Sequence, residues 1–290
     1  MNNLLKATLL FLLIFHSSVY AKEEIKWLIW ELNPEFISKG KEAQNGYADK
    51  FLKDFITMLP EYNHSIVVLN TRRWFLESSK KGHCTPHIWK RFKLDDQYYS
   101  KAYTLTAPHG ILIHKKNQKK FGEKNSMLSL ESILNDSSLT LTVPLFRYKK
   151  EGSRYPILYD YFKPHIGKKH LLEVTTSANE VSPRMLDINR ADYLIAYPTT
   201  ATAFSRIKKQ PNNYLFYPIK EDPYYKKIYV SCDKSNLGKT VIEKLNQLIT
   251  PKVHKKFLSY HEEWNEKNPQ FRKKYLDYFI HKKEDKFVIQ

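Results

Sequence analysis

The chain reads GYADKFLKDFITMLP over residues 46–60, and this stretch decides how the neighbouring sequence is interpreted. Its large apolar side chains recur every four residues, at Tyr47, Phe51, Phe55 and Leu59. This spacing predicts an amphipathic helix, which Pro60 ends. Short apolar runs rich in strand-forming residues lie on both sides of it, at 25–30 and 65–69. A strand, a helix and a second strand in succession favour an α/β fold.

The same alternation continues toward the C-terminus. Further strands are predicted at 84–89, 110–114, 139–143, 171–174, 193–197, 214–217 and 228–232. Further helices are predicted at 72–80, 128–134, 153–162, 179–189, 201–208, 237–249, 252–264 and 271–279. A lysine-rich segment at 115–120 separates two such series, which indicates two lobes. The segment 218–225 is interpreted as a return crossing, so that the first lobe combines both ends of the chain.

The N-terminus has the three parts of a secretory signal peptide. Lys6 gives a short positive region, an apolar segment follows over 8–15, and Val19-Tyr20-Ala21 fits a cleavage site. The apolar segment is short for a membrane span, which needs about 20 residues. We therefore expect cleavage after Ala21 and a free periplasmic protein, with a retained N-terminal anchor as the alternative. No later stretch is apolar enough to predict a membrane span.

Cleavage would leave 269 of the 290 residues, which is one large domain or two modest ones with a substantial core. The 48 lysines and arginines outnumber the 30 acidic residues, and Lys6 is the only charged residue that cleavage removes, leaving +17. Such a charge attracts anionic ligands, anionic membranes or nucleic acid. The lysines are dispersed, however, which is typical of a solvated basic surface. Export and the lack of a nucleic-acid-binding motif argue against nucleic acid.

The chain has two cysteines, Cys84 and Cys232. An even pair in an exported protein suggests a disulfide, which on a chain-entropy argument would stabilise the fold by roughly 4–5 kcal/mol. Two buried free thiols are the alternative. Cys84 also lies between His83 and His87, but one Cys-x-x-His without a second ligand pair is a weak metal or nucleophile motif. We predict no metal site and no cofactor.

Several short motifs follow the signal peptide in a fixed order. They are Pro34-Glu35-Phe36, Gly46-Tyr47-Ala48-Asp49, the segment Leu59–Tyr62, Arg91 followed by Tyr99-Ser100, and the segment Asn189–Pro198. In this order and spacing, residues 24–265 resemble the family 3 extracellular solute-binding proteins, the polar amino-acid-binding type, in a divergent branch. The resemblance implies a two-lobed periplasmic binding protein type II fold, in which each lobe is a mostly parallel sheet flanked by helices.

This fold divides the chain into five segments. They are the signal peptide 1–21, the first lobe at 22–116 and 218–265, the second lobe at 117–217, and a C-terminal helical extension at 266–290. The implied partners are a small-molecule ligand, held where the lobes close at the hinge, and an inner-membrane ABC permease or a sensor. We expect a monomer that does not span the membrane and binds no nucleic acid.

The resemblance also implies ligand contacts in the first lobe. In the family, an arginine just before a Phe-Ser or Tyr-Ser segment binds the ligand carboxylate, and Arg91 matches it. A planar guanidinium suits bidentate carboxylate binding. Trp30 and Phe36 match an aromatic first loop; Phe36 fits a cleft wall and a core position equally, and Trp30 fits the core slightly better. Of Arg72 and Arg73, we expect Arg73 to face the cleft.

In the second lobe the strand at 139–143 leads to Arg147, which could reach a ligand. Tyr197 and Thr199 lie at the C-terminal end of the strand at 193–197, where the family places the acid that binds the ligand's amino group. No carboxylate stands there, whereas Asp192 matches a structural acid before the strand. The resemblance and this departure from it predict a carboxylate-bearing or anionic ligand rather than an ordinary α-amino acid.

Two other functions remain open alternatives. The first is an enzyme on the same scaffold that acts on a cell-envelope substrate. No Ser-His-Asp or Gly-x-Ser-x-Gly pattern supports it, and the acidic cluster Glu262, Glu263 and Glu266 is typical of a solvated helix face. The second is a protein that binds a polyanion through its charge and aromatic residues. We favour reversible binding without catalysis.

Overall fold

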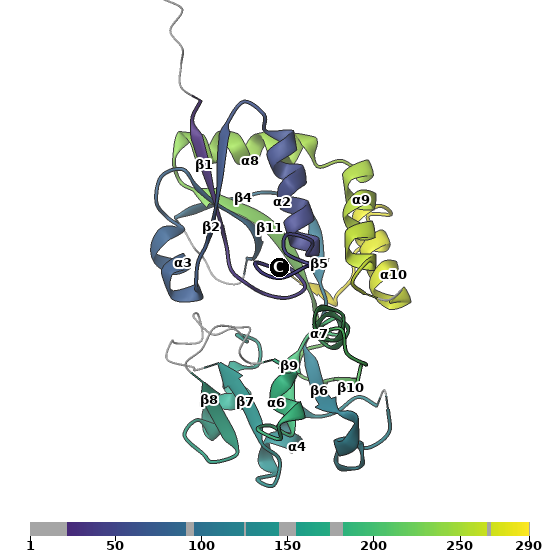
Figure 1. The fold of residues 1–290 in the computed structure, drawn as a ribbon. Coiled ribbons are helices and arrows are strands. Elements are labelled where there is room, and N and C mark those ends of the chain that lie inside the picture. Colours follow the sequence, from purple (N-terminus) through teal and green to yellow (C-terminus); the bar gives the residue numbers. More distant parts are fainter. Residues whose placement is uncertain are drawn as a thin grey trace, which may run out of the picture.

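The computed structural model describes residues 22–90, 96–124, 126–144, 155–174, 182–265 and 268–289. The predicted signal peptide at 1–21 and two predicted ligand contacts, Arg91 and Arg147, lie outside these ranges. The described residues form two mixed sheets, each with helices packed against it, one above the other in Figure 1. The predicted two-lobed α/β fold is confirmed. We call each sheet with its helices a lobe.

The first sheet has seven strands in the order β12-β11-β3-β1-β2, with β4 and β5 also paired to β11. The strands are β1 (Glu24–Ile29), β2 (Asn63–Val68), β3 (His83–Trp89), β4 (Gln97–Tyr99), β5 (Thr104–Thr106), β11 (Tyr225–Asp233) and β12 (Val288–Ile289). β1 pairs in parallel with both β2 and β3, whereas β11 runs antiparallel to β3, β4 and β5. The sheet is therefore mixed, because the return strand β11 enters it from the opposite end.

The second sheet has the order β10-β6-β9-β7-β8. Its strands are β6 (Gly110–His114), β7 (Leu141–Pro144), β8 (Leu171–Val174), β9 (Tyr193–Ala196) and β10 (Tyr214–Pro218). β6 runs antiparallel to β9 and β10, while β7 is parallel to β8 and β9. The expectation that 110–114 belongs to the first lobe is wrong, since its only strand partners among the described residues are in the second sheet. The chain crosses to that sheet through 107–109 and returns through 219–224.

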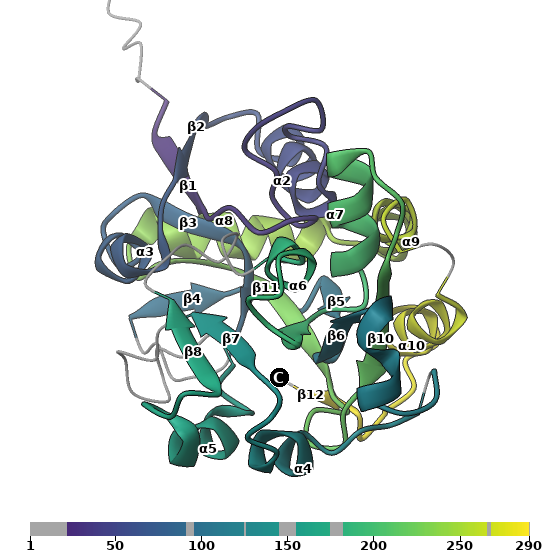
Figure 2. The same cartoon turned by 60° about the horizontal axis from the view of Figure 1, so that its bottom comes forward.

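Helices surround both sheets (Figures 1 and 2). In the first lobe they are α2 (Tyr47–Met58), α3 (Thr71–Glu77), α8 (Asn236–Leu248), α9 (Pro251–Glu262) and α10 (Pro269–Phe279). In the second they are α4 (Leu130–Asn135), α5 (Tyr159–Phe162), α6 (Arg184–Asp187), α7 (Thr200–Lys208) and the 3-10 helices η1 (Lys115–Lys120) and η3 (Lys163–His165). No helix among the described residues is long and apolar enough to cross a bilayer.

The start of α2 explains why the stretch 46–60 begins with glycine. A Cβ on Gly46 would lie 2.2 Å from the carbonyl oxygen of Glu35, so only glycine fits there. The Asp49 carboxylate accepts hydrogen bonds from the backbone N–H groups of Gly46 and Ile37, both at 3.0 Å. Burial raises the pKa of Asp49 to about 6 in spite of these two bonds. Asp49 thus ties the first loop to the helix that follows it.

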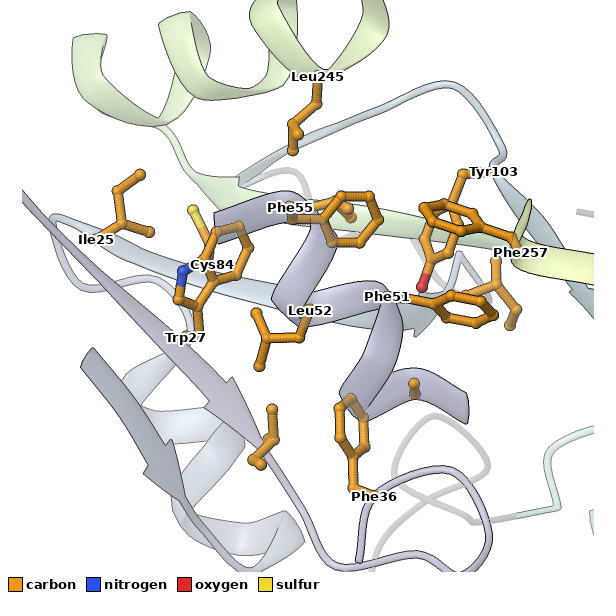
Figure 3. Packing of buried hydrophobic residues seen from close by; sticks show 14 of the residues in the cluster. Ile25, Trp27, Phe36, Phe51, Leu52, Phe55, Cys84, Tyr103, Leu245 and Phe257 are labelled. Atoms are coloured by element: carbon orange, nitrogen blue, oxygen red, sulfur yellow. The ribbon is translucent and has the colours of Figure 1, made fainter. Parts of the chain in front are cut away.

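The apolar face of α2 forms the centre of the first core. Phe51, Leu52 and Phe55 are at most 2% exposed and face Trp27 of β1 and Phe257 of α9 (Figure 3). The ring centroids of Phe51 and Phe257 are 4.6 Å apart. Burying side chains of this size stabilises a fold by about 1.5–3 kcal/mol each. Burial of this apolar face stabilises the predicted helix, which spans 47–58.

The predicted disulfide between Cys84 and Cys232 is confirmed. The two residues are directly opposite each other on the antiparallel neighbours β3 and β11. They are 148 residues apart in the sequence, and both are at most 2% exposed. The bond therefore joins the first part of the first lobe to the return strand and closes a long loop, which includes the whole second sheet.

The C-terminal residues pack on the first lobe as a helix and a strand, and sequence analysis missed the strand. Phe271, Tyr275 and Phe279 of α10 are buried in one cluster with residues of β5, β11 and α9. The chain then turns back, and β12 pairs with the start of β11. The ring of His254 on α9 stacks on Phe279 at 4.3 Å, and its Nδ1 lies 3.0 Å from the carbonyl oxygen of Tyr103.

Replacing both cysteines, Cys84→Ser with Cys232→Ser, should lower the free energy of unfolding by roughly 4–5 kcal/mol, because the unfolded chain regains the entropy of the open loop. Urea unfolding of the oxidised wild type and the double variant measures this difference. Equal stabilities would contradict the assignment of a stabilising role to the bond. The reduced wild type serves as the matched control and should behave like the variant.

Stability should fall as the pH drops from about 6.5 to about 4, partly through His254. Burial lowers the pKa of His254 from 6.5 to about 4. Between these pH values the imidazole is protonated in the unfolded chain but stays neutral in the folded chain. The resulting loss is about 3 kcal/mol at the acidic end. His254→Gln should flatten the pH dependence measured by urea unfolding, whereas His281→Gln, at an exposed position, should not. Identical pH profiles for His254→Gln and the wild type would contradict this.

Candidate functional site at the hinge between the lobes

The first lobe presents the carboxyl ends of three parallel strands to the second lobe. Figure 1 shows β1 running from the N-terminal end of the described chain toward the second lobe, and β2 and β3 run parallel to it. In open α/β sheets, ligands bind at this edge of the strands. The residues that directly follow the three strands are Trp30, Leu69 and Lys90.

Aromatic residues pack together along this edge. The ring of Trp30 lies 5.7 Å from that of Trp74 and 6.5 Å from that of Phe36, both edge-on. Trp74 is fixed by a 2.7 Å hydrogen bond from its Nε1 to the hydroxyl of Thr85. Phe36 is only 1% exposed, so it takes the core position of the two predicted for it. Trp30 is partly exposed, and Phe36 and Trp74 hold it at the edge.

The predicted arginine contact on α3 is on the surface. Arg73 lies in the first turn of α3 with its side chain exposed, and its backbone N–H donates to the Asn70 side chain that caps the helix. Lys90 is a second cation at this edge, with its ammonium 5.2 Å from the centre of the Tyr99 ring. Sequence analysis did not select Lys90, because one lysine among many carries no signal.

The second lobe contributes Tyr197 and Thr199, which connect β9 to α7. Thr199 occupies the N-cap position of α7, and the Thr200 hydroxyl accepts a 3.1 Å hydrogen bond from the Tyr197 backbone N–H. The Tyr197 ring stacks on His109 with centroids 4.4 Å apart. Burial, and next the charge of nearby Glu35, raise the pKa of Tyr47, and Tyr197 adds to this effect. Its stacking on His109 places Tyr197 beside the outgoing crossing between the lobes.

A buried ionic network links the two crossings between the lobes. The Asp222 carboxylate on the return crossing lies 2.8 Å from Nδ1 of His109 on the outgoing crossing and accepts a 3.0 Å hydrogen bond from its backbone N–H. Lys226, at the start of β11, donates to both Asp222 oxygens at 2.7 and 2.5 Å. Asp222 and Lys226 are at most 1% exposed. Their separation in the sequence from His109 hid this network from sequence analysis.

The two charged ends of this network respond differently to burial. Burial alone would raise the pKa of Asp222, but His109 and Lys226 together lower it to about 2. The pKa of Lys226 falls, because burial outweighs the attraction of its single carboxylate partner. Asp222 is thus firmly ionised at neutral pH, and it stays buried because Lys226 supplies the opposite charge and His109 a further polar contact.

A second polar cluster lies inside the first lobe, behind the hinge. The carboxylate of Glu35, 4% exposed, lies 3.8 Å from Nε2 of His87 and hydrogen bonds with the Tyr47 side chain. Nδ1 of His87 lies 2.8 Å from the hydroxyl of Tyr103. Burial lowers the pKa of His87 to about 3, so its ring is neutral. The sequence motif Pro34-Glu35-Phe36 pointed to this loop but gave no role to its glutamate.

Titratable residues converge at the hinge, but they are paired with each other inside the protein. In the part of the chain that the structure describes, no three histidine, cysteine, aspartate or glutamate side chains are grouped to hold a metal ion. The arrangement offers an aromatic edge on one lobe and the start of a helix on the other.

No family model and no curated protein matches the chain. Solved structures do. The probable amino-acid ABC transporter extracellular-binding protein of Bacillus subtilis matches at 16% identity and a TM-score of 0.59, over 84% of this chain and 97% of that one. A putative L-cystine ABC transporter protein of Listeria monocytogenes matches at 15% and 0.57, over 83% and 95%. An ancestral amino acid-binding protein, a precursor of cyclohexadienyl dehydratase, matches at 14% and 0.57, over 84% and 95%. The chain therefore has the two-lobed type II fold of periplasmic binding proteins.

Asp222→Asn should lower the free energy of unfolding by about 3–5 kcal/mol, because it leaves the buried Lys226 ammonium without its anion. Thermal and urea unfolding measure this loss. Glu61→Gln removes a surface partner of Lys244 and is the matched control, with an expected change below about 1 kcal/mol. Equal losses in the two variants would show that the hinge network does not hold the crossings together.

Proposed function

We propose that this protein reversibly captures a small carboxylate-bearing or anionic solute between its lobes and performs no catalysis. The observation that carries the proposal is the fold itself: two α/β lobes joined by two short crossings, a fold similar to solved structures of a probable amino-acid ABC transporter extracellular-binding protein and a putative L-cystine ABC transporter. Closure of such lobes removes water from the ligand and strengthens its polar contacts. Lys90 at the strand edge and the helix start at Thr199 are suited to an anion.

The proposed site combines residues of both lobes. Arg91, which directly follows Lys90 and the end of β3, would bind the carboxylate, with Arg147 and Arg73 as further cations. Trp30 would form an aromatic wall, and Tyr197 and Thr199 would contact the ligand from the second lobe. The absence of a carboxylate at 197–200 favours a ligand without a free α-amino group. The excess of basic residues supports an anion as well.

We also propose that the chain is exported after cleavage at Ala21 and acts in the periplasm as a monomer. The lobes would comprise 22–106 with 225–290 and 110–218, which moves the predicted boundaries to the observed crossings. A transporter permease or a sensor would respond to the closed state. The enzyme alternative has one supporting observation, the similarity to a precursor of a dehydratase. The internal pairing of Glu35 and His87 argues against it.

Thermal unfolding in the presence of organic acids, amino acids and cationic amines tests this proposal. A carboxylate ligand at 100 times its Kd should stabilise the protein by about 2.7 kcal/mol. Arg91→Ala should remove the stabilisation, and Arg91→Lys should weaken binding roughly tenfold or more, because lysine cannot form the bidentate contact. Lys101→Ala removes an exposed positive charge elsewhere and should bind normally. Stabilisation by cationic ligands alone would overturn the proposal.

A further inference from the structure

Helix α7 belongs to the second lobe by its place in the chain but has two packing faces. Ala201 and Phe204 pack in a cluster of the second lobe with Leu112 and Tyr214. Ala203 is buried in the core cluster of the first lobe, and Ile207 packs against the same cluster. The spacing of 203 and 207, one helical turn, puts both on one side of the helix. One helix therefore contributes to both cores.

Arg206 lies beside Ala203 and Ile207 and makes polar contacts with the first lobe. Its Nε and Nη2 donate to the two carboxylate oxygens of Glu42 at 3.1 and 3.2 Å, a bidentate pair. Its Nη1 donates to the backbone carbonyl of Glu263 at 3.2 Å. The guanidinium carbon lies 4.0 Å from the centre of the Trp264 ring. The Arg206 guanidinium thus donates from all three of its nitrogens and stacks on an aromatic ring.

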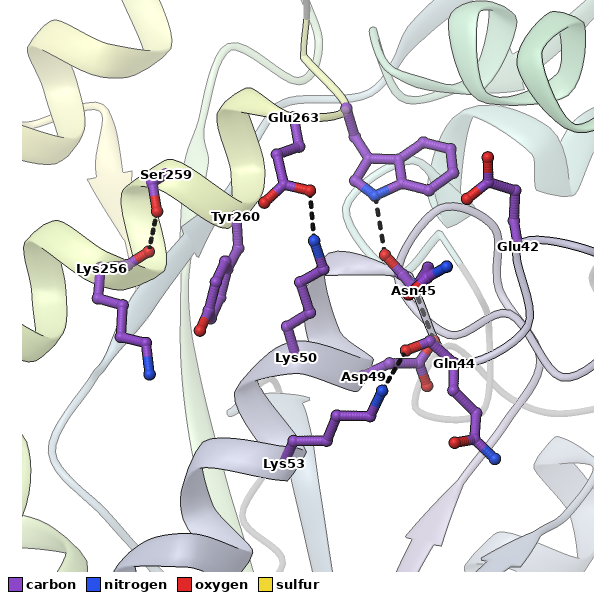
Figure 4. A network of polar contacts seen from close by, with 12 residues as sticks. Glu42, Gln44, Asn45, Asp49, Lys50, Lys53, Lys256, Ser259, Tyr260 and Glu263 are labelled. Atoms are coloured by element: carbon purple, nitrogen blue, oxygen red, sulfur yellow. Dashed lines mark hydrogen bonds and ion pairs between the residues drawn. The ribbon is translucent and has the colours of Figure 1, made fainter.

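The partners of Arg206 are themselves fixed within the first lobe. Trp264 is 1% exposed and donates from its Nε1 to the backbone carbonyl of Asn45, and Lys50 forms an ion pair with Glu263. Figure 4 shows Glu42, Asn45, Lys50 and Glu263 around one small area between the first loop, α2 and the end of α9. Glu263 and Trp264 are therefore fixed by contacts to α2 and the first loop.

We propose that Arg206 is a clasp that holds α7 against the first lobe without any ligand. The two crossings at 107–109 and 219–224 connect the lobes, and the clasp adds a third connection beside them. Opening of the lobes is then a rotation around α7, with the helix staying on the first lobe, and not a full separation. This limits how far the binding site opens.

The contacts of Arg206 combine a bidentate ion pair with stacking on a tryptophan ring. A bidentate arginine–carboxylate pair is oriented as well as charged, and stacking on tryptophan adds cation–π attraction. Arg206 and Glu42 are partly exposed, so their pair is screened by salt. The apolar contacts of Ala203 and Ile207 are not screened. Loss of the arginine should therefore loosen α7 without unfolding either lobe.

Hydrogen exchange without ligand, measured peptide by peptide, tests the clasp. Arg206→Ala should speed exchange in 200–208 and in 38–46 by roughly tenfold, as expected for the loss of one charged hydrogen-bonded contact. Exchange in β1 and β3 should not change. Small-angle scattering should show a larger radius of gyration for the variant. Lys208→Ala, an exposed cation on the same helix, is the matched control and should leave both measurements unchanged.

Two further variants keep the test decisive. Glu42→Gln removes the negative charge that Arg206 binds while leaving α7 itself unchanged, and it should also speed exchange in 200–208. This variant takes the place of Arg206→Ala if Arg206→Ala does not fold. Arg206→Lys keeps the positive charge but cannot form the bidentate contact with Glu42. It should therefore speed exchange in 200–208 nearly as much as Arg206→Ala. If Arg206→Ala or Glu42→Gln exchanges like Lys208→Ala, the clasp is overturned. Because no ligand is present, this outcome is separate from the outcome for the proposed binding function.

Discussion

The ionised Asp222 carboxylate, held between His109 and Lys226, is the interaction on which the arrangement of the two lobes depends. It joins the outgoing crossing, the return crossing and the first residues of β11 at one buried point. A buried charge is costly unless it is paired, so the three groups must stay together for any of them to stay buried. This constraint places β6 and β10 beside each other as they leave the hinge. It also aligns β11 with β3, to which the disulfide fixes it.

Three further sets of contacts, made by Tyr197, Arg206 and Trp30, restrict how the two lobes are arranged around the Asp222 network. Tyr197 stacks on His109, so the segment that connects β9 to α7 contacts the hinge network. Arg206 connects the next helix to the first lobe on the other side. The aromatic edge around Trp30 is supported from within its own lobe by Phe36 and Trp74. A ligand between these edges would find a preorganised first lobe and a second lobe with limited freedom, which lowers the entropic cost of closure.

Sequence reasoning predicted the features that depend on local pattern. The periodicity of α2, the two series of strands and helices, and the cysteine pair were all readable from spacing and composition. It missed β4, β5 and β12, because strands of two or three residues have no detectable alternation. It assigned Gly110–His114 to the wrong lobe, because only long-range pairing decides which sheet a strand joins.

The candidate site was less predictable than the fold, for the same physical reason. His109 and Asp222 are 113 residues apart, and Arg206 and Glu42 are 164 apart, so no local signal connects them. Phe36 could be assigned to core or cleft only after its neighbours were placed. Tyr197 and Thr199 could be placed at the end of a recognisable strand, but their contact with a ligand stays a prediction. The contacts of Arg91 and Arg147 stay predictions.

The central claim is that an anionic solute binds between the lobes. A crystal structure of the protein purified from its native host, without removal of any bound ligand, tests it most directly. The account predicts density for a small anionic molecule between the Trp30 edge and the start of α7, with the Arg91 guanidinium on its negative group. A bound cation at this place, or a molecule that contacts only one lobe, would contradict it.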